Sequence, residues 1–175
     1  MVIIITGASH TGKTKLAQKL LEKYQYPYLS IDHLKMGLIR SKMINVSVYD
    51  DENLTGTLWP VVSEMIKTAI ENKQNLIVEG CYIPSDWQKS FDDDYLNDIK
   101  FICLYMTKGY IMQNYNEIIK HSNDIENRIM DEISIDELIK DNESYLKRFK
   151  DNNILIINND YQKDIDKWLG DHIYA

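Results

Sequence analysis

Eight residues near the amino terminus combine the residue types that bind phosphate groups. The stretch from Gly7 to Thr14 reads GASHTGKT and fits the pattern G-x-x-x-x-G-K-[ST]. Glycines permit backbone angles that other residues resist, so successive N–H groups can point inward at phosphate oxygens. The Lys13 ammonium would reach the β- and γ-phosphates, and the Thr14 hydroxyl would bind Mg²⁺. The spacing therefore predicts a triphosphate site with ATP and Mg²⁺ as cofactors.

The whole motif is expected to contact the nucleotide. The residues predicted to bind the cofactor are Gly7, Ala8, Ser9, His10, Thr11, Gly12, Lys13 and Thr14. His10 occupies a variable position of the motif, where its side chain could contact the nucleotide or a lid. A helix beginning near Lys13 would add its positive dipole end to the site.

Two carboxylates lie at the ends of apolar runs. Asp32 follows PYLSI, and Glu79 ends LIVE. Phosphoryl transfer needs a group that orients and deprotonates the acceptor, and a buried carboxylate needs a cation or a donor. We expect Asp32 to be catalytic and to bind the substrate, and Glu79 to act in catalysis or to bind Mg²⁺. Two alternatives stay open: Asp32 could cap a helix that begins at His33, and Glu79 could hydrogen-bond the loop backbone.

The residues after these two acids are candidates for binding the phosphoryl acceptor. Lys35 and Arg40 follow Asp32, and the planar fork of Arg40 suits a carboxylate or phosphate. Gly80 and Tyr82 follow Glu79, although an aromatic residue here could equally belong to the core. The combination predicts a small, hydroxylated and anionic acceptor.

Five short apolar runs are predicted to form the strands that position these residues. They span Val2–Thr6, Pro27–Ile31, Leu76–Glu79, Phe101–Met106 and Ile154–Ile157. Their continuous apolar character is typical of parallel strands that are covered on both faces. Helical periods lie between them, so the sequence predicts an α/β fold with ligands at the carboxyl ends of the strands.

Three local patterns predict where helices begin. Ser134 with Glu137, and Ser85 with Gln88, fit the capping box. Pro60 is expected near a helix start, where its missing N–H costs little.

The chain resembles the small P-loop kinases, a group that includes shikimate, gluconate, adenylate and uridine kinases, zeta toxins and chloramphenicol phosphotransferases. The resemblance covers most of the chain and rests on the phosphate loop, on Asp32, on VEG at 78–80 and on a lid-like segment. YLSIDHLKMGLIRS and LIVEGCYIP are similar to short proteins described as adenylate or 2-phosphoglycerate kinases.

The resemblance implies a P-loop NTPase fold of three α/β/α layers. Its five-stranded parallel sheet would have the order 2-3-1-4-5, within one kinase domain over residues 1–175. A helical lid would span about 107–134 and supply Arg128 as a catalytic arginine, unless Arg128 only pairs with Glu132 in a helix. Lys35 stands where adenylate kinases carry arginine, and EGCYIP replaces their DGFPR, which argues against AMP as acceptor.

Composition limits the remaining possibilities. The 175 residues carry a net charge of −7 without a Lys/Arg-rich block, which argues against nucleic acid and membrane surfaces as partners. No apolar stretch approaches the length of a membrane span. Cys81 and Cys103 fit reduced core residues of a cytoplasmic protein. We expect a monomer or homodimer that acts on a small molecule.

The leading hypothesis is an ATP- and Mg²⁺-dependent kinase of a small metabolite. One alternative is a nucleotide or nucleoside kinase. Another is a non-catalytic nucleotide switch, although the chain lacks the Asn-Lys-x-Asp motif that GTP switches of the Ras type carry.

Overall fold

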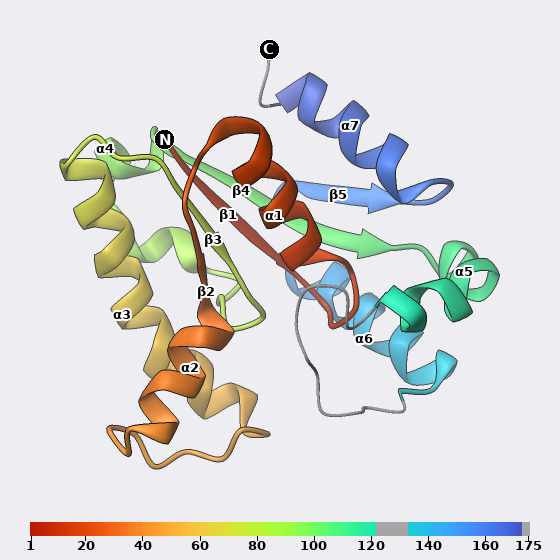
Figure 1. Cartoon of the computed structure of the whole chain (residues 1–175), viewed down its shortest axis with the longest axis horizontal. Coiled ribbons are helices and arrows are strands. Elements are labelled where there is room, and N and C mark those ends of the chain that lie inside the picture. Colours follow the sequence, from red (N-terminus) through yellow and green to blue (C-terminus); the bar gives the residue numbers. More distant parts are fainter. Residues whose placement is uncertain (122–132, 173–175) are drawn as a thin grey trace. The chain divides into compact units, whose positions relative to one another are not determined.

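The computed structural model of the chain describes residues 1–121 and 133–172. Five parallel strands form one sheet with the order β2-β3-β1-β4-β5, which confirms the predicted fold class (Figure 1). The strands are β1 (Val2–Gly7), β2 (Tyr28–Ser30), β3 (Leu76–Glu79), β4 (Ile99–Met106) and β5 (Ile154–Ile157). Every residue of β1 is buried, as expected for a strand that is covered on both faces.

Seven α-helices and one 3₁₀ turn are present in the described residues. They are α1 (Lys13–Tyr24), α2 (Ile31–Arg40), α3 (Asp51–Glu71), the 3₁₀ turn η1 (Trp87–Ser90), α4 (Asp93–Leu96), α5 (Lys108–Lys120), α6 (Ile135–Arg148) and α7 (Tyr161–His172). Helix α1 begins at Lys13, as predicted. Strand β2 is shorter than predicted because Ile31, the last residue of its apolar run, begins α2.

The predicted helix starts had different outcomes. The capping box at α6 is confirmed: the Glu137 N–H donates to Ser134 Oγ at 3.3 Å, and the Ser134 N–H donates to the Glu137 carboxylate at 2.9 Å. The box at Ser85 is wrong, because the turn there is the 3₁₀ segment η1, preceded by Asp86.

The prediction for Pro60 is also wrong, since Pro60 lies inside α3. That helix begins at Asp51, where Asp50 accepts a hydrogen bond from the Asn53 N–H at 3.3 Å. Two acids in its first turn, Asp51 and Glu52, favour this earlier start through the helix dipole.

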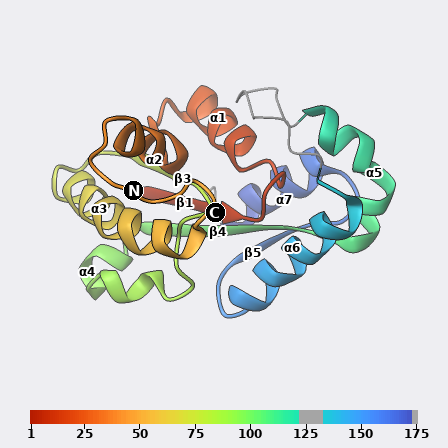
Figure 2. The ribbon, with the colours of Figure 1, turned by 90° about the horizontal axis from the view of Figure 1, so that it is seen from below.

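Contacts divide the chain into two compact units. The first comprises residues 1–6 and 14–101, and the second comprises residues 7–13 and 102–175. In the first unit α1 lies on one face of the strands and α3 on the other, and in the second unit α6 and α7 flank β4 and β5 (Figure 2). The unit boundary passes through the phosphate motif, between Lys13 and Thr14.

Two further properties of the described residues bear on the expectations from composition. Cys81 and Cys103 are both reduced; Cys103 is buried, whereas Cys81 is half-buried. Burial raises the pKa of Cys103 to about 12. None of the helices in the described ranges is long and apolar enough to cross a bilayer.

Candidate functional site

The phosphate loop has the backbone conformation that its glycines allow. Gly12 has a φ of 82° and His10 a φ of 64°, both in the left-handed region. Loops with such residues form the concave rows of N–H groups that bind anions. At Gly7 a Cβ atom would lie 2.6 Å from the backbone oxygen of Leu104, so only glycine fits at that position. The loop therefore has a cradle that side chains would obstruct.

Hydrogen bonds within the loop hold the Lys13 side chain in place. The Ala8 carbonyl accepts one hydrogen bond from Thr11 Oγ1 and one from Lys13 Nζ, each at 2.8 Å. Lys13 is only 5% exposed. A buried ammonium is costly without an anion beside it, and the carbonyl of Ala8 is a neutral partner. This arrangement fits a phosphate group next to the Lys13 ammonium.

Tyr161, the first residue of α7, holds the other end of the loop. Its hydroxyl donates to the Gly12 carbonyl at 2.7 Å. Its ring leaves no room for a side chain, since a Cβ at Gly12 would lie 2.5 Å from the Tyr161 oxygen. Sequence reasoning missed Tyr161 because 149 positions separate the two residues and no local pattern links them.

In the first unit, Thr14 and Glu79 form a pair of oxygen donors. Thr14 Oγ1 donates to Glu79 Oε2 at 3.3 Å, and Glu79 is 1% exposed. Hydroxyl and carboxylate oxygens are the ligands that Mg²⁺ prefers. The described residues contain no cluster of three or more His, Cys, Asp or Glu side chains suited to a metal. The Thr14 hydroxyl and the Glu79 carboxylate are oxygens that could hold Mg²⁺, with phosphates and water completing its shell.

Ser30 lies beside Glu79 and was also missed by sequence reasoning. Ser30 and Glu79 are register partners on the parallel strands β2 and β3, so their side chains share one face of the sheet. Ser30 is 2% exposed, and its hydroxyl has no hydrogen-bond partner in the part of the chain that the structure describes. A buried hydroxyl without a partner is costly, which suits a bound water or ligand at this place.

Gly80 allows the chain after Glu79 to pass close to α2. A Cβ at Gly80 would lie 2.9 Å from the Cβ of Ile31, closer than real Cβ contacts. The Gly80 carbonyl accepts a hydrogen bond from Thr6 Oγ1 at 2.9 Å. The structure therefore gives Gly80 a packing role, and its predicted contact with the substrate stays a prediction.

Lys35 joins Asp32 to Tyr82. Its Nζ donates to Asp32 Oδ1 at 2.6 Å and to the Tyr82 hydroxyl at 2.8 Å, and it lies 4.9 Å from the centre of the Tyr82 ring. Burial by itself lowers the pKa of Lys35, but the hydrogen bonds to Asp32 and Tyr82 outweigh it and raise the pKa to about 12. Burial also raises the pKa of Tyr82. The Lys35 ammonium is therefore charged at neutral pH.

Asp32 does not cap a helix that begins at His33. Helix α2 begins at Ile31 with Ser30 at its N-cap position, so Asp32 lies in the first turn. The Asp32 side chain is 36% exposed, which leaves it accessible to a small molecule.

Of the two arginines that were predicted to act, only Arg40 lies in the described residues, and it is not brought to this cluster. Arg40 is exposed and ends α2, about 12 Å along the helix axis from Asp32 at 1.5 Å per residue. Arg128 lies outside the described residues, as does the part of the expected lid that spans 122–132. The remainder of that lid segment begins with α5, capped by Thr107, which accepts from the Tyr110 N–H at 3.2 Å.

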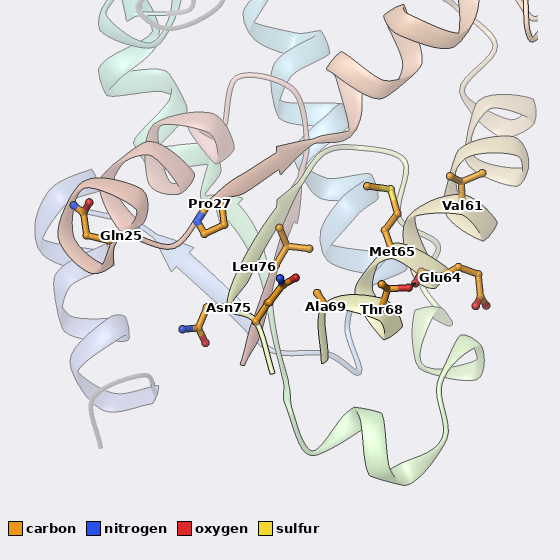
Figure 3. Close-up of a pocket in the computed structure, with 10 residues that line it drawn as sticks. Gln25, Pro27, Val61, Glu64, Met65, Thr68, Ala69, Asn75 and Leu76 are labelled. Atoms are coloured by element: carbon orange, nitrogen blue, oxygen red, sulfur yellow. Dashed lines mark hydrogen bonds between the residues drawn. The ribbon is translucent and has the colours of Figure 1, made fainter. Parts of the chain in front are cut away.

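A groove of about 810 Å³ lies at the amino ends of strands β2 and β3, opposite to the ends that carry Ser30 and Glu79 (Figure 3). Pro27 and Leu76, at the amino ends of these strands, line it together with Met65 of α3. Its acidic residue, Glu64, pairs with Lys67 at 2.7 Å. The groove includes none of the predicted site residues, so it is separate from the candidate site.

Several solved structures with a similar fold are kinases. A shikimate kinase from Bacteroides thetaiotaomicron matches with a TM-score of 0.55 and 16% identity, over 97% of this chain and 97% of its own. A sugar kinase from Janibacter sp. HTCC2649 matches with a TM-score of 0.56 and 12% identity, over 97% and 92%. A deoxyadenosine kinase from M. mycoides, solved with the products dCMP and a flexible dCDP bound, matches with a TM-score of 0.55 and 17% identity, over 98% of each chain.

These likenesses and the sheet order show that the chain has the fold of the small P-loop kinases. The sequence matches no family model, and no curated protein matches it. At identities of 12–17% the likeness concerns the fold. The reaction must be inferred from the residues of the site.

Proposed function

We propose that this chain is an ATP- and Mg²⁺-dependent kinase that transfers the γ-phosphoryl group to a hydroxyl of a small molecule. The contact between Thr14 and Glu79 carries the proposal. Thr14 ends the phosphate motif, and its hydroxyl lies against a buried carboxylate at a strand end. Both side chains offer the hard oxygen ligands that a magnesium site beside a triphosphate uses.

The residues of the site have separate roles in this proposal. Lys13 and the loop N–H groups bind the triphosphate, and Thr14 with Glu79 holds Mg²⁺. When bound, Mg²⁺ neutralises charge on the phosphate oxygens. Asp32 orients the acceptor hydroxyl and takes its proton, and Lys35 with Tyr82 binds the acceptor.

The charges around Tyr82 bear on the kind of acceptor. The ammonium of Lys35 is compensated by the carboxylate of Asp32, whose Oδ1 lies 2.6 Å from Lys35 Nζ. The case for an anionic acceptor depended on Arg40, which is exposed at the far end of α2. This balance supports an uncharged acceptor, and it favours a nucleoside kinase as the second candidate function.

Binding of ATP tests the proposal first. Isothermal titration calorimetry should show Mg²⁺-dependent binding of ATP to the wild-type protein, and Lys13→Ala should lose most of the affinity. Lys23→Ala is the matched control, because Lys23 is an exposed lysine in the last turn of the same helix. Equal affinity in wild type and Lys13→Ala would refute the site.

A panel of acceptors tests the reaction. Polyols, nucleosides, hydroxy acids and sugar phosphates would be screened by thermal shift and by ADP release, since ligand binding raises apparent stability. The proposal expects ADP release to rise with an uncharged hydroxyl compound. ATP binding without any acceptor-stimulated ADP release would favour the nucleotide-switch alternative.

A further inference from the structure

We propose that Tyr161 is a positioning residue for the phosphate loop, because it holds the Gly12 carbonyl and thereby directs the Lys13 N–H toward the phosphates. The inference rests on the proposed function, since it treats the loop as a triphosphate site. All the contacts that carry it lie within the second unit.

The peptide group between Gly12 and Lys13 couples the direction of its carbonyl to that of its N–H. The Gly12 carbonyl and the Lys13 N–H belong to one peptide group, which is planar and trans, so they point in opposite directions. Tyr161 holds that carbonyl at 2.7 Å. The Lys13 N–H must then point away from Tyr161. Because Lys13 is the first residue of α1, this N–H has no acceptor within its own helix and can donate to a phosphate oxygen.

A similar arrangement holds the start of the loop. The Ala8 carbonyl accepts from Thr11 Oγ1 and from Lys13 Nζ, which directs the N–H of Ser9 to the opposite side. The Ala8 carbonyl is held by residues of the motif itself. The Gly12 carbonyl is held by a residue outside it, and this makes Tyr161 a separate determinant of the loop conformation.

Tyr161 is itself held by a hydrogen-bonded turn. Asp164 Oδ2 accepts from the N–H groups of Asn158 at 2.8 Å, Asn159 at 3.1 Å and Asp160 at 3.4 Å. Asp160 Oδ1 accepts from the Lys163 N–H at 2.8 Å. These bonds order the residues on both sides of Tyr161, so its hydroxyl has a fixed place. The left-handed φ of 82° at Gly12 and the contact with the Tyr161 ring both require glycine there.

Tyr161→Phe removes the hydroxyl and keeps the ring that packs on Gly12. The control is Tyr105→Phe, which removes another tyrosine hydroxyl bond in the same unit, the one to Glu143 at 2.9 Å. Both variants would be checked by thermal unfolding. Dissociation constants would then be measured by calorimetry, well below the unfolding temperature, for ATP with Mg²⁺ and for inorganic tripolyphosphate.

We expect Tyr161→Phe to weaken both ligands alike, by about tenfold, the effect of one well-placed hydrogen bond. Tyr105→Phe should bind both ligands as the wild type does, even where it lowers stability as much. Unchanged affinity in Tyr161→Phe would overturn the inference, as would equal losses in the two variants. A loss for ATP alone would overturn it too, by assigning Tyr161 to the nucleoside. If Lys13→Ala binds ATP as the wild type does, the proposed function fails before the role of Tyr161 is in question.

Discussion

The hydroxyl of Thr14 donates to the carboxylate of Glu79 at 3.3 Å, across 65 positions of sequence. The contact joins the last residue of the phosphate motif to the end of β3. Ser30, the register partner of Glu79, adds a third oxygen to the same face of the sheet. Under the proposed function, these oxygens would face the hydrated cation.

Glu79→Gln should weaken the dependence of nucleotide binding on Mg²⁺. The amide oxygen can still accept from Thr14, but the negative charge is lost. We expect the Mg²⁺ concentration for half-maximal ATP binding to rise by about tenfold or more, a loss typical of removing a group at a metal site. Calorimetric titrations with ATP at a series of Mg²⁺ concentrations measure it.

Glu143→Gln serves as the control for this variant. Glu143 is a carboxylate that also accepts from a hydroxyl, that of Tyr105. Its Mg²⁺ titration should overlay that of the wild type. If the Glu79→Gln titration overlays it as well, Glu79 does not hold the metal.

Asp32→Asn should slow phosphoryl transfer while nucleotide binding survives. Asparagine keeps an oxygen that can accept from Lys35, but it is far too weak a base to take the acceptor proton. We expect turnover to fall by about 100-fold, the usual contribution of a general base, and the dissociation constant for ATP to stay within about twofold. Steady-state ADP release with the best acceptor of the panel provides the measurement.

The matched control for Asp32 is Asp86→Asn. Asp86 pairs with Lys89 at 3.1 Å with the same three-residue spacing, but both side chains are exposed. Its removal should leave turnover unchanged. If Asp32→Asn turns over at the wild-type rate, Asp32 is not the general base, and its role is the structural ion pair with Lys35.

Gly80→Ala should destabilise the fold. The added Cβ would meet Ile31 Cβ at 2.9 Å and its Cδ1 at 3.2 Å, and such overpacking costs about 1–3 kcal/mol. The midpoint of thermal unfolding should fall by about 2–4 °C for each kcal/mol in a chain of this size. Differential scanning calorimetry measures the shift.

The same substitution at Gly56 is expected to have the opposite effect on the stability of the fold. Gly56 lies inside α3, and a Cβ there would meet no atom within 4 Å. Alanine should therefore stabilise the helix by about 0.5–1 kcal/mol. If Gly80→Ala is as stable as the wild type, Ile31 can move to admit the added Cβ without lowering the free energy of unfolding.

The sequence alone determined the features that depend on neighbouring residues. The alternation of apolar runs with helical periods predicted the five strands, because a strand buried on both faces must be apolar along its length. The glycines and Lys13 of the motif predicted the phosphate loop, because these residue types lie within eight positions of one another and their spacing is itself the signal. The capping box at Ser134 was found for the same reason: its two hydrogen bonds join residues three apart.

Only the tertiary structure decided which distant residues meet. The sequence named both Lys35 and Arg40 as candidates for binding the acceptor. Only the structure shows that α2, which begins at Ile31, brings Lys35 to Asp32 and Tyr82 and leaves Arg40 at its far end. Tyr161 and Ser30 carry no local pattern, and they reach the loop and Glu79 through sheet order and strand register. Such contacts depend on the packing of elements far apart in the chain, and local propensity carries no information about them.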